Sequence, residues 1–228
     1  MDRQVALDLD RKDPLREFKK KFVITDPDTC YLDGNSLGRL PHSTVEAITS
    51  FLTQEWGREV VDGWNHWIDE AQSTGDLIGR SALGAGPGQV LACDTTSVNF
   101  YQLALAAIKA RPGRKTVITD AANFPTDRYI LQGIANDLGL RLVLIDNEDP
   151  QISEHEYITP DLLEKYLSDD VALVTLEVVQ YRAGARHDVR RITELVKSYG
   201  AYMLWDAAHA IGSVQLNFDR DGVDLAIG

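Results

Sequence analysis

The spacing of apolar residues predicts mainly helix in the first third of the chain. We expect an amphipathic helix within residues 1–22 and a longer helical stretch over residues 42–83. Pro41 precedes that stretch, and Gly57 and Gly63 interrupt it. Residues 1–70 are therefore predicted to form an N-terminal helical segment that also carries a loop.

From about residue 89 onward, short apolar runs alternate with helical segments. The predicted strands are Gln89–Cys93, Thr116–Thr119, Arg141–Ile145, Ala172–Leu176, Tyr202–Trp205 and Asp224–Ile227. The predicted helices are 96–109, 125–137, 160–167 and 188–199. Such alternation is typical of βαβ units, so residues 71–228 are predicted to form an α/β domain, with a mainly parallel sheet and helices on both faces.

Composition and charge narrow the class of protein. The chain has 228 residues, a net charge of −12 and two cysteines, Cys30 and Cys93. An acidic chain is a poor partner for nucleic acid or an anionic membrane, and two cysteines provide neither a disulfide framework nor a metal site. Cys93 ends an apolar run and is expected in the core. A charged N-terminus and the lack of a long apolar stretch favour a cytoplasmic protein.

A carboxylate comes directly after the predicted strand Tyr202–Trp205. This residue is Asp206, and His209 follows three positions later. Ligands of open α/β sheets bind at the carboxyl ends of the strands, and a buried carboxylate needs a cationic partner. The protonated pyridine nitrogen of pyridoxal phosphate (PLP) is one such partner. An Asp that caps the following helix is the alternative interpretation.

Two other strand ends carry side chains that suit a cofactor. Thr96 and Ser97 open a predicted helix, where their hydroxyls and backbone N–H groups either bind a phosphate or simply cap the helix. Phe124 follows the strand Thr116–Thr119 and either covers one face of a flat heterocycle or acts as a hydrophobic staple. Three strand ends therefore offer a phosphate site, an aromatic ring, and a carboxylate with a histidine.

In this order, the three features resemble those of the fold type I PLP enzymes. A narrower resemblance is to the kynureninases. It rests on YLDGNSLG at Tyr31–Gly38, DTTSVN at Asp94–Asn99, FPTD at Phe124–Asp127 and WDAAH at Trp205–His209. The resemblance implies a homodimeric enzyme of tryptophan catabolism that hydrolyses the Cβ–Cγ bond of an amino-acid substrate. That substrate is L-kynurenine or 3-hydroxykynurenine, and the products are anthranilate or 3-hydroxyanthranilate and L-alanine.

The resemblance also implies roles for individual residues. The implied cofactor-binding residues are Thr96, Ser97, Phe124, Asp127, Glu177, Asp206 and His209. The two hydroxyl residues would hold the phosphate, the phenyl ring would stack on the pyridine, and Asp127 would lie near the ring substituents. Asp206 would pair with the pyridine nitrogen, and His209 would support the cofactor from the same turn.

Four residues near the N-terminus are implied on the substrate side. They are Asn35 and Ser36 in the YLDGNSLG segment, and Trp64 and His66 in a GWNHW segment. For the tryptophans of GWNHW, a place in the core is an equally good interpretation.

The chain departs from the kynureninase pattern at two points. Glu177 stands where the family usually has a small hydroxyl residue, and it would add a second negative charge beside the cofactor. The Schiff-base lysine of the family is expected about four residues beyond Gly228, so no catalytic residue is assigned within this chain. Because the pattern stops directly after a strand, we expect the front part of a longer fold, inactive alone.

Two other functions are compatible with these patterns. One is a different class V-type PLP enzyme, such as a desulfurase-like lyase, whose catalytic cysteine would lie outside this chain. The other is a non-catalytic, truncated protein with the PLP fold, which the missing lysine favours. A lysine soon after Gly228 in a longer sequence would favour an enzyme.

Overall fold

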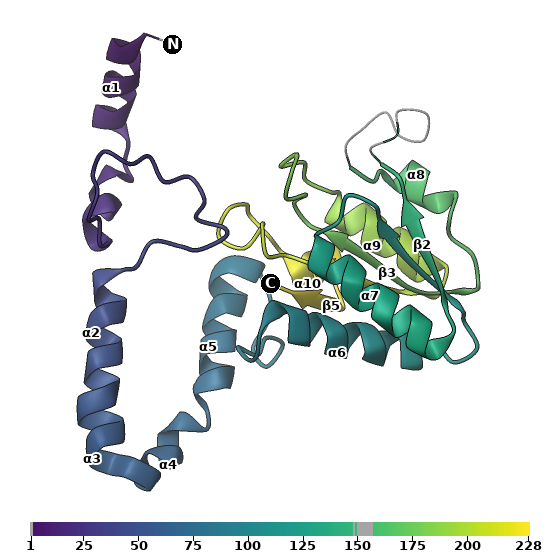
Figure 1. Cartoon of the computed structure of the whole chain (residues 1–228), viewed down its shortest axis with the longest axis horizontal. Coiled ribbons are helices and arrows are strands. Elements are labelled where there is room, and N and C mark those ends of the chain that lie inside the picture. The colour runs from purple at the N-terminus through teal and green to yellow at the C-terminus, as the bar shows by residue number, and fades with distance from the viewer. Residues whose placement is uncertain (1, 148, 150–156) are drawn as a thin grey trace. The chain divides into compact units, whose positions relative to one another are not determined.

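The computed structural model describes residues 2–147, 149 and 157–228, and divides into two compact units, Met1–Ile68 and Asp69–Gly228 (Figure 1). The first unit consists of helices and a loop. Its elements are α1 (Arg3–Lys12), η1 (Arg16–Lys21), α2 (His42–Ser50), η2 (Phe51–Trp56), α3 (Gly57–Glu59), η3 (Val60–Gly63) and α4 (Trp64–Trp67). Pro41 is the N-cap of α2, and the helical path changes at Gly57 and Gly63, as the sequence predicts.

The second unit is built on a parallel sheet. Its strands are β1 (Thr116–Asp120), β2 (Arg141–Ile145), β3 (Val171–Glu177), β4 (Tyr202–Asp206) and β5 (Leu225–Ile227). They pair side by side in the order β2-β1-β3-β4-β5, and every pair is parallel. The helices are α5 (Glu70–Ile78), η4 (Gly79–Leu83), α6 (Thr96–Lys109), α7 (Pro125–Leu138), α8 (Pro160–Glu164), α9 (Val189–Ser198) and α10 (Phe218–Asp221).

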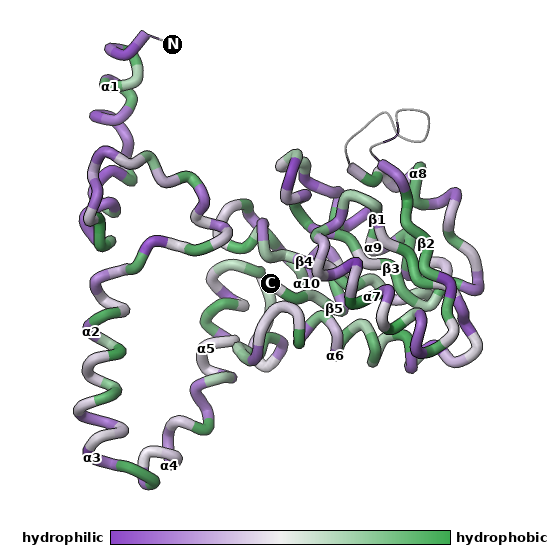
Figure 2. The backbone as a smooth tube through the Cα atoms, in the orientation of Figure 1, coloured by the Kyte–Doolittle hydropathy of each residue, from purple (hydrophilic) through white to green (hydrophobic). Residues whose placement is uncertain are grey.

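Helices cover both faces of this sheet. On one face, α6 and α7 pack apolar side chains such as Phe100 and Leu131 against the strands. On the other face, α8 and α9 pack against the strands, with Ile192 and Trp205 fully buried between the layers. Figure 2 shows hydrophobic residues concentrated in the strands. The predicted α/β fold is confirmed, and its strands and helices differ from the prediction mainly at their ends.

One predicted strand is wrong. Residues 89–93 form no strand, because their backbone groups hydrogen-bond to residues of helix α5 and not to a strand of the sheet. The Gln72 side chain donates to the Val90 carbonyl at 2.9 Å, and the Ala92 N–H donates to the Ala71 carbonyl at 3.1 Å. This segment therefore lies along α5, and Cys93 is exposed at its end instead of buried in the core.

The strand order brings polar strand ends together. After β1 the chain moves outward to β2, then crosses back past β1 to form β3. The order reverses between β1 and β3, and ligands of open α/β sheets bind at such a switch point. None of the helices within the described residues combines the length and hydrophobicity that crossing a membrane requires.

Candidate cofactor-binding site

Four carboxyl groups gather at the carboxyl edge of the sheet. Asp120, Glu177 and Asp206 end β1, β3 and β4, and Glu177 is the register partner of Asp206. Asp127 joins them from the first turn of α7. The four residues are between 1% and 4% exposed. Acidic residues are rarely buried unless they are paired, so this edge of the sheet is a candidate functional site.

Asp127 and Asp206 interact directly through their carboxyl groups. Their carboxyl groups lie within hydrogen-bonding reach of each other. Burial, followed by the charge of Asp206, raises the pKa of Asp127 to about 8. Burial also raises the pKa of Asp206, although the Ala208 N–H, which donates to its Oδ1 at 2.8 Å, favours the charged form. The pair is therefore stable only when a proton, or a cation, lies between or beside the two groups.

The surroundings of Glu177 also favour its neutral form. Burial, then the charges of Asp120 and Asp206, raise the pKa of Glu177 to about 9. Its Oε2 accepts from the Tyr181 N–H at 3.5 Å, and its Oε1 has no hydrogen-bond partner among the described residues. In the chain without cofactor a neutral acid is favoured at this position at pH 7, and the expected second negative charge beside a bound cofactor stays a prediction.

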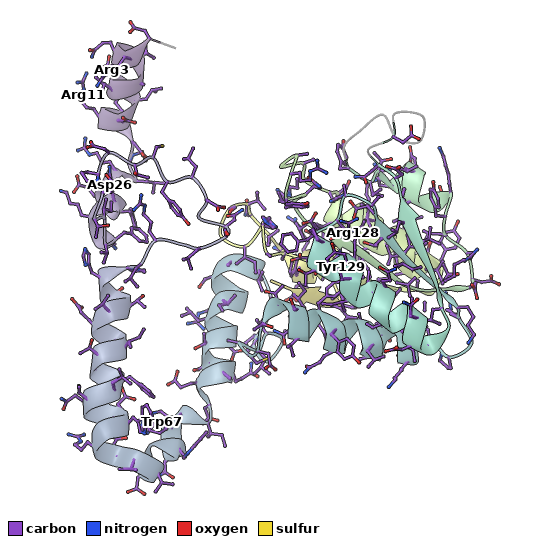
Figure 3. All side chains as sticks on the ribbon, in the orientation of Figure 1. Arg3, Arg11, Asp26, Trp67, Arg128 and Tyr129 are labelled. Carbon is purple, nitrogen blue, oxygen red and sulfur yellow. The ribbon has the colours of Figure 1, made fainter. Side chains whose placement is uncertain are left out.

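Asp120 was missed by the sequence analysis. Burial raises the pKa of Asp120 to about 6, and the neighbouring side chains of Asn123 and Asn147 lower it in part. The positive charge of Arg128, the next residue after Asp127 on α7 (Figure 3), partly offsets this shift in the pKa of Asp120. The signal was present in the sequence, because Asp120 follows an apolar run directly, as Asp206 does.

Three rings lie beside the carboxyl groups. The Phe124 ring is 5.2 Å from the Tyr181 ring and 6.1 Å from the His209 ring, and Tyr181 and His209 are 6.1 Å apart. The His209 Nδ1 atom is 3.9 Å from Glu177 Oε1. Phe124 is 37% exposed, so part of its ring is free to cover a flat ligand. Tyr181 adds a ring to which the sequence analysis assigned no role.

Buried amides fix this arrangement. Asn123 donates to Thr119 Oγ1 at 2.8 Å and accepts from the Phe124 N–H at 2.6 Å. Gln180 donates to the Ala122 carbonyl at 3.0 Å, which ties the loop after β3 to the loop after β1. Because these side chains are themselves buried and paired, the strand ends that carry Phe124 and Glu177 are held in place.

Thr96 and Ser97 begin α6 as predicted. Thr95 is the N-cap, and its side chain accepts from the Val98 N–H, which leaves the hydroxyls of Thr96 and Ser97 free of helix capping. The C-terminal end of α6 leads into the amino end of β1, so its N-terminus lies toward the carboxyl edge of the sheet. A helix N-terminus with two hydroxyls suits an anion such as a phosphate.

The predicted substrate-side residues belong to the first unit. Asn35 and Ser36 lie in the loop between η1 and α2. Trp64 is 61% exposed within its unit, so its alternative interpretation as a core residue is wrong. His66 Nε2 lies 3.7 Å from Glu55 and 3.6 Å from Glu59. Their role toward a substrate stays a prediction.

The chemistry of the carboxyl cluster favours a cationic N–H group over a metal ion. Within the described part of the chain, no group of three or more His, Cys, Asp and Glu has the arrangement of a metal site. No ion pair joins a Lys or Arg to the four carboxylates there, although His209 lies 3.9 Å from Glu177 and the charge of Arg128 acts on Asp120. A protonated pyridine nitrogen fits, because it offers one positive charge and one hydrogen-bond donor to Asp206 while Phe124 covers the ring.

Comparison with known proteins agrees with this geometry. The family model for aminotransferase class-V matches residues 30–227. The chain belongs to this family. Class-V relatives with similar sequences include the kynureninases of Pseudomonas fluorescens, 33% identical over 99% of this chain, and Deinococcus radiodurans, 37% identical over 96% of it. The chain spans about half the length of these curated relatives, 53% and 52% respectively.

Solved structures that share the fold of this chain include a cysteine desulfurase and a mutant of C-DES. The apo cysteine desulfurase of Thermococcus onnurineus matches with a TM-score of 0.71 and 19% identity, over 96% of this chain and 52% of that one. A mutant of C-DES with glycine covalently linked to the PLP cofactor matches with a TM-score of 0.72 and 19% identity, over 88% of this chain and 52% of that one. At such identities, the likeness concerns the fold alone.

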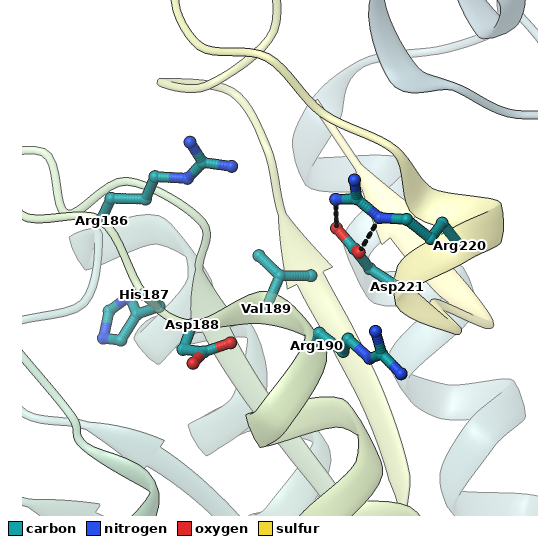
Figure 4. Close-up of a pocket in the computed structure, with 7 residues that line it drawn as sticks. All are labelled: Arg186, His187, Asp188, Val189, Arg190, Arg220 and Asp221. Carbon is teal, nitrogen blue, oxygen red and sulfur yellow. Dashed lines mark hydrogen bonds and ion pairs between the residues drawn. The ribbon is translucent and has the colours of Figure 1, made fainter.

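A separate pocket of about 380 Å³ lies at the start of α9 (Figure 4). The residues that line it are Arg186, His187, Asp188, Val189, Arg190, Arg220 and Asp221. Its arginines already have partners: Arg186 donates to the Gln215 carbonyl, Arg190 pairs with Glu194, and Arg220 pairs with Asp221. We therefore assign no ligand to this pocket.

Proposed function

We propose that this chain forms the cofactor-binding part of a kynureninase-type, PLP-dependent hydrolase acting on L-kynurenine or 3-hydroxykynurenine. The observation that carries the proposal is the sequence similarity to kynureninases along nearly the whole chain. The cluster of buried carboxyl groups around Asp206 supports the choice of cofactor independently, because it calls for a cationic N–H group. In this proposal the longer protein works as a homodimer in the cytoplasm, in tryptophan catabolism.

The residues of the chain would divide the work as follows. Asp206 would hold the pyridine nitrogen in its protonated form, Phe124 would cover one face of the ring, and Thr96 and Ser97 would bind the phosphate. The chemistry that PLP supplies when bound is the withdrawal of electrons from the bonds at the substrate α-carbon. Asp127 would keep Asp206 oriented, because the two carboxyl groups lie in contact.

A lysine that follows Gly228 in a longer protein would emerge next to Asp206. The Ala207 N–H donates to the Ile227 carbonyl at 2.7 Å, which fixes the end of β5 against the turn after β4. A Cβ atom on Gly228 would lie 3.1 Å from the backbone of Ala207 and 3.2 Å from that of Ala208. This close approach supports our proposal that the covalent link to the cofactor comes from the residues immediately beyond β5.

Substrate release assays on the longer protein test the proposal. Purified protein loaded with PLP is expected to release anthranilate from L-kynurenine, or 3-hydroxyanthranilate from 3-hydroxykynurenine. The same sample is then given L-cysteine, and release of sulfur is measured. Sulfur transfer without anthranilate would favour the desulfurase-like alternative, and tight PLP binding without turnover of either substrate would favour a non-catalytic protein.

A further inference from the structure

Glu177 is the acid of the site that lies next to the histidine His209, with the two side chains 3.9 Å apart. Its side chain is 1% exposed. Its carboxyl group is influenced by Asp120 on β1, Asp127 on α7 and Asp206 on β4, and His209 lies on its remaining polar side. No Lys or Arg in the described part of the chain forms an ion pair with Glu177, and the long hydrogen bond from the Tyr181 N–H, at 3.5 Å, only partly offsets the effect of burial on its pKa.

Simple electrostatics requires that some of these acids carry a proton. Four carboxylates at one buried edge would repel one another strongly, because the surroundings screen charge poorly. Of the values resolved within the cluster, the pKa of Glu177 is the highest, at about 9, compared with about 8 for Asp127 and about 6 for Asp120. Glu177 is therefore the acid best placed to keep its proton at neutral pH.

His209 connects this proton with the surroundings. Its Nδ1 atom lies 3.9 Å from Glu177 Oε1, the oxygen that accepts no hydrogen bond. The His209 side chain is 23% exposed, whereas that of Glu177 is 1% exposed. The rings of Phe124 and Tyr181 pack beside the imidazole, so they limit other access to the acid. A small rotation of His209 would shorten the gap to a hydrogen bond.

We propose that Glu177 stores an exchangeable proton inside the site and that His209 carries this proton to and from solvent. In the outward direction, the O–H bond of Glu177 breaks as an N–H bond forms on Nδ1 of His209, and the imidazolium then releases the Nε2 proton to water. The return path restores the neutral acid. A threonine or serine at this position cannot act in this way, because its hydroxyl does not ionise near neutral pH.

A catalytic role for this proton rests on the proposed function. Hydrolytic cleavage of a carbon–carbon bond leaves one carbon that must take up a proton, and a neutral acid beside the cofactor is a suitable source. Glu177 is a positioning residue in this account, since the structure shows it in contact with His209 and not with a reacting atom.

The proton on Glu177 is tested on the purified 228-residue chain without added PLP. Infrared difference spectra recorded against pH are expected to show the carbonyl band of a protonated acid that disappears near pH 9. Glu177→Gln should remove this band, and Glu194→Gln, which changes an exposed acid on α9, should not. The protonated acid of Asp127 contributes a second band that disappears near pH 8, so a band that disappears near pH 9 and survives Glu177→Gln would overturn the proposal. If Glu177→Gln fails to fold, carbon-13 NMR of Glu-labelled wild-type protein measures the ionisation of Glu177 directly. Ionisation of Glu177 below pH 6 would overturn the proposal.

The route through His209 is tested by isotope exchange. After transfer into heavy water, the acid band of Glu177 is expected to shift at least tenfold more slowly in His209→Phe than in the wild type. His209→Asn should behave similarly, and His42→Phe, which changes an exposed histidine in the first unit, should exchange at the wild-type rate. Equal rates in all four proteins would overturn the route. Since no step involves kynurenine, failure here leaves the anthranilate assay as an independent test of function.

Discussion

Asp127 in the first turn of α7 and Asp206 at the end of β4 hold their carboxyl groups in contact inside the protein. The two residues come from distant parts of the sequence, and the pKa of each is raised by burial. Contact between two buried acids costs stability unless a proton or a cation is shared. The relationship therefore indicates a pair that keeps a proton in the free chain and that a positively charged ligand would also stabilise.

We expect Asp206→Asn to abolish most of the activity of the longer enzyme, while Asp206→Glu keeps a part. A neutral amide cannot keep a pyridine nitrogen protonated, and loss of such an electrostatic contact costs roughly 3 kcal/mol, or a factor of 10² to 10³ in kcat. Steady-state release of anthranilate measures the effect. Asp224→Asn is the matched control, because Asp224 pairs with Lys197 ahead of β5. Near-normal turnover in Asp206→Asn would show that Asp206 is only a helix cap.

The stability of the chain without cofactor should depend on pH. The folded-state pKa values of Asp127 and Glu177, about 8 and about 9, lie above their ordinary values of 3.8 and 4.5. The unfolded chain therefore loses these protons first, so the stability that these two groups contribute is fully present below about pH 4 and is lost as the pH rises to about 9. Buried His187, whose pKa is lowered to about 4 from 6.5, acts in the opposite direction below about pH 6.5. Thermal unfolding of the second unit between pH 7 and pH 9 therefore checks the direction, and a midpoint that rises over this interval would contradict it.

Asp127→Asn should remove part of this pH dependence. The amide cannot ionise, so we expect the variant to be more stable than the wild type at pH 8 by about 1 to 3 kcal/mol, and close to it at pH 4. Denaturant titrations at both pH values measure the difference. Asp137→Asn changes an exposed acid on the same helix and should show no such gain. A loss of stability at pH 8 would mean that the charged form of Asp127 is the native one.

Thr96→Val and Ser97→Ala should each weaken the binding of PLP to the chain. A hydrogen bond from a hydroxyl to a charged phosphate contributes about 1.5 to 3 kcal/mol, which corresponds to a loss of at least tenfold in affinity. Equilibrium dialysis of PLP against each variant measures this effect. Ser198→Ala, at the end of α9, serves as the control. If both variants bind PLP with unchanged affinity, the two hydroxyls take no part in phosphate binding and are only residues of the first turn of α6.

The 228-residue chain should form no specific covalent adduct with PLP. Its lysines are at positions 12, 19, 20, 21, 109, 115, 165 and 197. Lys197 donates to the Gly222 carbonyl at 3.2 Å and pairs with Asp224 at 2.9 Å, at the amino end of β5 and away from the carboxyl edge. Borohydride reduction followed by peptide mass analysis should find only sparse, scattered labelling. Full labelling of one lysine would contradict the site.

The sequence by itself predicted most strands and helices of the second unit, and it singled out Asp127, Glu177 and Asp206 one by one. Period and length were sufficient to predict β2 and α6, because each is a local pattern bounded by clear turn or capping residues. The same local signals placed Asp206 and Phe124 at strand ends. The strand predicted at Gln89–Cys93 is wrong for a related reason. An apolar run predicts a buried strand, and only the tertiary contacts of this segment with α5 keep it out of the sheet.

Only the tertiary structure decided which acids meet and what charge they carry. The strand order places Asp120, Glu177 and Asp206 at one edge, and α7 adds Asp127. The protonation state of an acid depends on burial and on the charges around it, and neither quantity is a property of local sequence. The sequence gives Glu177 its carboxyl group, whereas burial among other acids, which raises its pKa to about 9, comes only from the fold.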